Sequence, residues 1–168
     1  MDISRTESQR EKDNTELVRR HFDVLWNQGG LAAVEDFFGD EFSNFGRRGP
    51  DAHALIRSIV AAWRSAFPDL HYEIDDEIVS ADAVVHRVTL TGTHTGTFEH
   101  PAVGVIEPSG RSFAVDQVHI SRVRDGRIVE HWGTRNDLAM LQQLGAVTGP
   151  ERAGSITESA GWQRPPDT

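Results

Sequence analysis

Residues 117 to 137 hold the side chains whose types and spacing suit acid–base chemistry. Gln117 and His119 are two residues apart, and His131 and Asp137 follow within the next eighteen positions. An imidazole changes protonation near neutral pH and can act as a general acid or base. An amide can donate to a carbonyl or enolate oxygen. We therefore predict His119, His131 and Asp137 as catalytic residues and Gln117 as a substrate-binding residue.

Each of these residues also has a purely structural interpretation. His119 is then a hydrogen-bonded histidine of the core, and His131 is a surface imidazole beside Glu130. Asp137 then only favours the positive end of a helix. The choice depends on which strand face carries each side chain.

A predicted β-hairpin positions these residues. Apolar and polar residues alternate over 113–123, the turn Arg-Asp-Gly-Arg follows at 124–127, and alternation resumes over 128–132. Side chains two apart share a face of a strand, so Phe113 lies on the same face as Gln117 and His119. Polar side chains on an otherwise apolar face need partners or a ligand. This face predicts a pocket wall, with Phe113 as a further substrate-binding residue.

The remaining chain supplies helices first and strands afterwards, which is typical of an α+β domain. The periodicities predict three N-terminal helices packed on one face of a curved, mostly antiparallel sheet that surrounds a pocket. The segments are helices at 14–28, 31–38 and 51–67, a short extended piece at 41–50, strands at 70–78 and 83–96, a loop or loose edge pair at 97–111, and a last helix at 137–145.

The domain boundaries follow from composition. Residues 1–13 are charged and aperiodic, which predicts a flexible lead-in. Residues 14–146 form the predicted domain, and residues 147–168 form a polar tail with Trp162 as its anchor.

Four further residues are candidates for binding a substrate. Arg87 is either exposed or a cation that holds a carboxylate at the pocket mouth. Asn44 either faces a ligand or closes an Asx-turn. Asn136 follows the hairpin and can cap the last helix, and Trp63 lies in a helical apolar stripe that also suits the core.

Composition narrows the class of partner. The chain has 17 basic and 26 acidic residues, and its formal charge of −9 opposes binding to nucleic acid or to an anionic membrane. There is no long apolar run or signal-peptide pattern, so we expect a cytoplasmic protein that binds a hydrophobic small molecule. The chain has no cysteine, and the spacing of His94, Glu99 and His100 matches no known metal motif. We expect no metal.

The other face of the hairpin also carries apolar side chains. Val118, Ile120 and Trp132 have no core to join if the helices cover the opposite face. Such a patch usually meets another subunit, so we predict a homodimer or higher homo-oligomer through the outer sheet face.

Three motifs together resemble the SnoaL-like polyketide cyclases, also called ester cyclases. They are GTHTG at 92–96, DQVHISRVRDGRIVEHW at 116–132 and LQQLG at 141–145, and the likeness extends over roughly 15–145. The resemblance implies the cone-shaped α+β barrel that is shared with nuclear transport factor two and ketosteroid isomerase. It also implies ring closure by intramolecular aldol condensation, without a metal or an organic cofactor.

One position departs from the family pattern. The resemblance matches Gln117 and His119 to the polar wall of the cyclising members, and His131 to the histidine of their second hairpin strand. Their catalytic aspartate follows that histidine by two residues, where Gly133 stands here. Two functions remain open: a cofactor-independent enzyme that cyclises or isomerises a polyketide-like molecule, and a non-catalytic binding or accessory protein, such as a partner of an oxygenase or reductase.

Overall fold

The structure is a computed structural model that describes residues 6–48 and 52–148. The predicted tail lies almost wholly outside the described residues, and Trp162 with it. The helices are α1 (Glu7–His21), the π-helix η1 (Phe22–Asn27), the 3-10 helix η2 (Leu31–Ala33), α2 (Val34–Phe37), α3 (Ala52–Ala66) and α4 (Asp137–Leu144). The strands are β1 (Phe38–Asn44), β2 (Arg47–Arg48), β3 (His71–Val79), β4 (Ala83–Thr93), β5 (Phe98–His100), β6 (Gly104–Ile106), β7 (Ser112–Arg124) and β8 (Arg127–Arg135).

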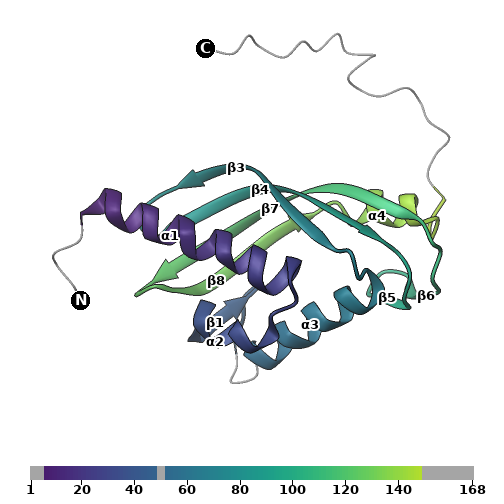
Figure 1. The fold of residues 1–168 in the computed structure, drawn as a ribbon, viewed down its shortest axis with the longest axis horizontal. Coiled ribbons are helices and arrows are strands. Elements are labelled where there is room, and N and C mark those ends of the chain that lie inside the picture. The colour runs from purple at the N-terminus through teal and green to yellow at the C-terminus, as the bar shows by residue number, and fades with distance from the viewer. Residues whose placement is uncertain (1–5, 49–51, 149–168) are drawn as a thin grey trace, which may run out of the picture.

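One six-stranded sheet organises the described part of the chain. Its strand order is β2-β1-β8-β7-β4-β3, and every neighbouring pair is antiparallel except β1 with β8. The sheet curves over α1 and α3 (Figure 1), and side chains of both helices join the buried cluster on its inner face. The predicted α+β class is confirmed. The sheet is open, with β2 and β3 as its edges, and does not close into the expected barrel.

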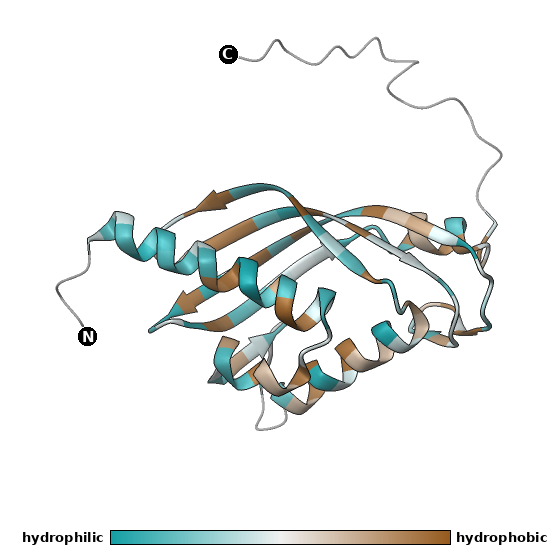
Figure 2. Cartoon of the chain, viewed as in Figure 1, coloured by the Kyte–Doolittle hydropathy of each residue, from teal (hydrophilic) through white to brown (hydrophobic). Residues whose placement is uncertain are grey.

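Alternation in β7 produces the predicted wall. Phe113, Val115, Gln117 and His119 are buried, while the residues between them are exposed. The strands accordingly alternate between hydrophobic and hydrophilic residues in Figure 2. The inner face of the sheet therefore changes from apolar to polar towards the middle of β7.

The turn between β7 and β8 fixes the register of the hairpin. Asp125 and Gly126 both have positive φ, at 49° and 71°. Two such residues make a turn whose twist matches that of paired strands, and Asp-Gly is one of the few sequences that adopt it at low cost. The predicted hairpin is confirmed.

Helix α1 begins seven residues before the predicted start. Thr6 is the N-cap, and its side chain accepts a hydrogen bond from the backbone N–H of Gln9. Asn14, at which the predicted helix begins, lies within α1 instead, and its side chain donates to the carbonyl of Ala81. The first turns are hydrophilic (Figure 2), so no apolar period revealed them.

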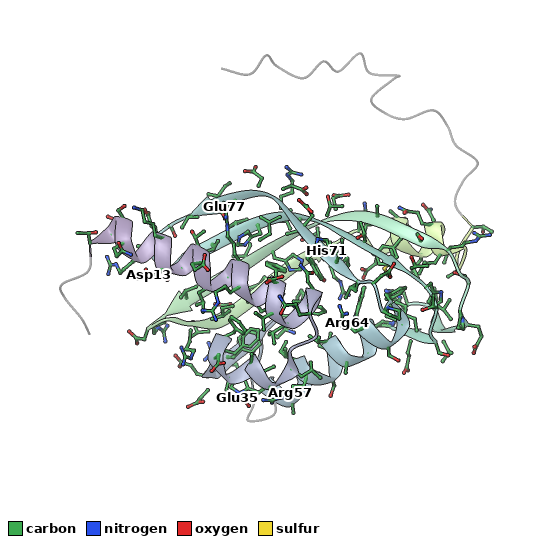
Figure 3. The ribbon with its side chains drawn as sticks, viewed as in Figure 1. Asp13, Glu35, Arg57, Arg64, His71 and Glu77 are labelled. Carbon is green, nitrogen blue, oxygen red and sulfur yellow. The ribbon has the colours of Figure 1, made fainter. Side chains whose placement is uncertain are left out.

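Arg64 closes the end of the π-helix η1. Its Nη1 donates to the carbonyls of Trp26 and Asn27, and its Nη2 donates to the carbonyl of Pro68. Figure 3 shows this arginine on α3 below the end of α1. The side chain of Asn27 also pairs with both backbone groups of Tyr72. These bonds connect η1 to α3 and β3.

Among the described residues, no helix is long and apolar enough to cross a membrane.

Candidate active site

A small cavity lies between the helices and the polar part of the inner sheet face. Its volume is about 60 Å³, which has room for roughly four water molecules. Most of its wall is apolar, as is common in sites that bind small organic molecules. The polar side chains on the wall are His21, Asn44, Tyr72, His119, Ser121, His131 and Arg135.

An irregularity in β8 turns His131 into this cavity. Residues Ile128 and Glu130 pair with consecutive residues of β7, so Val129 is an extra residue that forms a β-bulge. Ile128 is buried and lines the cavity, and strict alternation would then place His131 on the outer face. The bulge shifts the alternation by one residue, so both side chains face inward.

His119 and His131 are joined in a chain of hydrogen bonds that begins and ends at an amide oxygen. Nε2 of His119 lies 2.9 Å from Oε1 of Gln117. Nδ1 of His119 lies 2.9 Å from Nε2 of His131, and Nδ1 of His131 lies 2.8 Å from Oδ1 of Asn44. The two imidazole rings are stacked at an interplanar angle of 20°. We call His119 and His131 the histidine dyad.

The number of protons in this chain determines its charge. An amide oxygen only accepts, so three hydrogen bonds that end in two amide oxygens need three N–H groups on the dyad. Two neutral imidazoles carry only two, and a third proton makes the dyad a cation. This arrangement is therefore complementary to the protonated dyad, while the neutral dyad lacks one proton.

Burial keeps the dyad neutral at physiological pH. It lowers the pKa of His119 well below the usual value, and the neighbouring His131 lowers it further. Burial, followed by the charge of Arg135, lowers the pKa of His131 to about 4. A neutral dyad whose hydrogen-bond acceptors favour the cation can take up a proton from a bound molecule.

Tyr72 adds a donor to the same cavity. Its ring centroid is 5.9 Å from that of His119, and its hydroxyl has no hydrogen-bond partner among the described residues. Burial raises the pKa of this hydroxyl, which therefore stays protonated. Tyr72 can donate to an oxygen atom of a ligand.

Gly133 has no side chain, and this leaves room for the dyad. It pairs with His119 across the hairpin, and a Cβ at this position would lie 3.0 Å from Nδ1 of His119. That is closer than side chains usually pack, so a larger residue would have to displace the imidazole. The glycine and the contact between the two histidines therefore belong together.

Five of the candidate residues from the sequence come together here. Asn44, Trp63, His119 and His131 line the cavity, and Gln117 lies directly behind His119 with 1% of its surface exposed.

Four candidates lie elsewhere. Phe113 packs against Phe67 in the core, and Arg87 is on the outer face beside Asp75. The remaining two are near the start of α4: Asn136 caps the helix and donates to Asp116, and Asp137 pairs with Arg135 and His100.

Four polar residues of the cavity were not predicted from the sequence. Ser121 follows Gln117 and His119 at intervals of two, so strand parity could have identified it. Tyr72 has the same kind of signal in β3, and His21 lies three residues after buried Val18 in α1. Arg135 carries no such signal, because its position depends on the bulge in β8.

Comparisons with known proteins agree with the motifs. The sequence model of the family described as SnoaL-like polyketide cyclase matches residues 16–144. The aklanonic acid methyl ester cyclases DnrD of Streptomyces peucetius and DauD of Streptomyces sp. (strain C5) are each 30% identical over 138 residues. This region is 77% of the chain, and it covers 89% of DnrD and 80% of DauD. The structure of TsrD from Streptomyces laurentii superposes with a TM-score of 0.69 at 27% identity, covering 81% of this chain and 97% of TsrD.

Proposed function

Because the chain belongs to the SnoaL-like polyketide cyclase family, we propose that it closes a ring in a hydrophobic, polyketide-like molecule by acid–base catalysis. The observation that carries this proposal is the hydrogen-bonded dyad of His119 and His131 in the wall of an apolar cavity. The dyad takes the place of the aspartate that Gly133 replaces. The proton then moves through imidazoles instead of a carboxylate.

The reaction begins at His131. In the neutral dyad with the His131 proton on Nε2, the amide of Asn44 turns away and exposes the unprotonated Nδ1, which removes a proton from a carbon next to a substrate carbonyl. The C–H electrons form an enolate, whose carbon attacks a second carbonyl of the same molecule and forms the ring bond. The dyad returns its proton to the new alkoxide, so the product is an isomer of the substrate.

The other polar residues stabilise the charges that develop. Oε1 of Gln117 accepts a hydrogen bond from the Nε2–H of His119, and the dyad shares its additional proton between the two rings. Tyr72 donates to the enolate oxygen, and Arg135 supplies a positive charge on the cavity wall. Oriented donors in a site that excludes water act more strongly than they would in solution.

A turnover assay tests this function. The substrate is aklanonic acid methyl ester, for which the relatives DnrD and DauD are named. We expect a ring-closed product of unchanged mass, detected by chromatography and mass spectrometry. Linear polyketide esters of other lengths complete the panel, and recovery of every compound unchanged at substrate-level protein would contradict the proposal.

A binding or accessory protein is the second candidate. Gly133 offers no proton, and all four nitrogens of the dyad already have partners. A ligand could then lie in the cavity without reacting. Saturable binding of the ester, followed by its recovery unchanged, would support this alternative.

A further inference from the structure

A second and larger pocket lies beside the cavity, between the C-terminal half of α3 and the β5–β6 hairpin. We call it the outer pocket. It has a volume of about 780 Å³, and Ala62, Phe98 and Val105 form part of its apolar lining. Figure 1 shows β5 and β6 next to the end of α3. The reaction proposed above makes no use of this pocket.

The outer pocket and the inner cavity share one wall. Ile59, Trp63 and Arg135 line both spaces. The Arg135 guanidinium carbon lies 5.9 Å from the centre of the Trp63 ring, so these two side chains form a partition. Side chains that separate two spaces can merge them by a change of rotamer, without movement of the backbone.

The volumes of the two spaces indicate why a large substrate would need both of them. The inner cavity of about 60 Å³ cannot hold a molecule with several rings, because sites for such ligands usually span about 300–1,000 Å³. The outer pocket lies within that range. A substrate that reaches the dyad therefore needs the outer space for the rest of its structure.

We propose that the outer pocket is a second subsite, which binds the unreactive part of an elongated, uncharged, multi-ring substrate, with Arg135 and Trp63 as the partition. This inference rests on the proposed function for the location of the reacting end. It adds a site, a size class and a charge class to it.

The β5–β6 hairpin sets the position of the partition. Nδ1 of His100 accepts the backbone N–H of Ala102, so the neutral ring carries its proton on Nε2, which lies 3.4 Å from Oδ2 of Asp137. The same carboxylate oxygen accepts from Nη2 of Arg135 at 3.0 Å. Arg135 is thus held between Asp137 and the ring of Trp63.

The charges around the pocket favour an uncharged ligand. Glu99 and Arg135 line the pocket, and Asp137, next to the pocket, already pairs with Arg135, so the guanidinium charge is offset and Glu99 adds a negative charge to the lining. The whole chain has a formal charge of −9. An anionic group would meet a net negative region and would lose its hydration, whereas an aryl group would gain apolar contacts.

A matched pair of fluorescent probes tests the charge class. N-phenyl-1-naphthylamine is uncharged, and 8-anilinonaphthalene-1-sulfonate has the same rings with an added sulfonate. We expect the uncharged probe to bind the wild-type protein at least about tenfold more tightly, a difference of about 1.4 kcal/mol. Equal affinities, or tighter binding of the sulfonate, would overturn the charge assignment.

Tryptophan substitutions test the location. Ala62→Trp fills the outer pocket from α3, while Ala61→Trp adds the same side chain at an exposed neighbour that lines neither space. We expect Ala62→Trp to raise the Kd of the uncharged probe about tenfold or more and Ala61→Trp to leave it within about twofold. Equal effects of the two variants would overturn the subsite.

A second pair of variants guards against a folding defect. Ser65→Trp enters the same pocket, and Ser58→Trp is its exposed control on α3. Probe binding requires no turnover, so an inactive dyad would leave these results unchanged. Conversely, a negative result in the probe-binding tests would leave the turnover assay for ring closure unaffected.

Discussion

At the scale of single residues, Gly133 leaves room for the contact between His119 and His131. Its hydrogen faces His119, and this leaves the imidazole free to bind His131 at 2.9 Å. In the related cyclases the resemblance places an aspartate here, and a carboxylate would compete for the same nitrogen. We therefore propose that the glycine belongs to an alternative proton-transfer arrangement.

Gly133→Ala should separate the two rings of the dyad. The new Cβ would lie 3.0 Å from Nδ1 of His119, and the imidazole must move to relieve this contact. We expect the hydrogen bond between His119 and His131 to be lost, with about a tenfold or greater drop in kcat for ring closure. The ¹⁵N chemical shifts of the two imidazoles report the change directly.

Gly39→Ala is the matched control for this variant. A Cβ at Gly39 meets only the side chains of Val129 and Arg127, at 3.4 and 3.7 Å, which are ordinary contacts and involve neither histidine. This variant should keep the wild-type ¹⁵N shifts and turnover. Unchanged shifts in Gly133→Ala would show that the glycine does not support the dyad.

At the scale of secondary-structure elements, the hydrogen bonds of the Arg64 guanidinium hold the helical wall of the cavity in place. We call this set of bonds the Arg64 clamp. Four backbone carbonyls accept from this one guanidinium, those of Trp26 and Asn27 in η1 and those of Pro68 and Leu70 after α3. Removing it leaves those carbonyls without their partner where the chain is partly buried. The positions of η1 and of Trp26 within it therefore depend on the Arg64 clamp.

Arg64→Met should reduce the free energy of unfolding by about 2–3 kcal/mol, because hydrogen bonds to a charged group are lost. Urea denaturation measures this change. Arg57→Met on the same helix is the control, since its partner Glu35 is an exposed carboxylate (Figure 3) and exposed pairs contribute little. A loss in Arg57→Met as large as in Arg64→Met would contradict the clamp.

The elements differ in how well the sequence predicts them. The β7–β8 hairpin is predictable because alternation and an Asp-Gly turn agree. The start of α1 is not predictable from apolar spacing, because its first turns are polar. Only the cap at Thr6 marks where the helix begins. Nothing in the local sequence marks the bulge at Val129. The inward position of His131 therefore follows only from the register of β8 against β7.

At the scale of the whole molecule, several neutral histidines are buried in the core. Burial lowers the pKa of His21 to about 3, and burial followed by Arg135 lowers that of His131 to about 4. In the unfolded chain both titrate near 6.5. Below that pH the unfolded chain binds protons that the folded chain does not, so stability falls as the pH falls.

The free energy of unfolding should therefore decrease between pH 6.5 and pH 5, by up to about 1.4 kcal/mol per pH unit for each such histidine. Urea denaturation at several pH values measures the slope. His21→Phe, which suits the surrounding aromatic side chains, should make the slope shallower. A flat profile over this range would contradict neutral burial.

The outer sheet face predicts the assembly. Val118, Ile120 and Trp132 remain 40%, 38% and 44% exposed, which is unusual for adjacent apolar side chains on one strand pair. We propose that this face joins two copies of the chain. Light scattering should show a dimer or larger assembly for the wild type and a monomer for Ile120→Lys.

Leu138→Lys is the control for the assembly. Leu138 is 63% exposed on α4 and belongs to no strand of the sheet, so its substitution should preserve the oligomer. A wild-type protein that is monomeric at micromolar concentration would remove the prediction.

The central claim is that the histidine dyad moves the proton during ring closure, and a comparison of two His→Ala variants tests it most directly. The measurement is kcat for aklanonic acid methyl ester in wild type, His131→Ala and His71→Ala, where His71 is an exposed histidine of β3 outside the cavity. We predict a loss of about 10²-fold or more in His131→Ala, as expected for a missing general base, and wild-type turnover in His71→Ala. Equal turnover in all three proteins would contradict the claim.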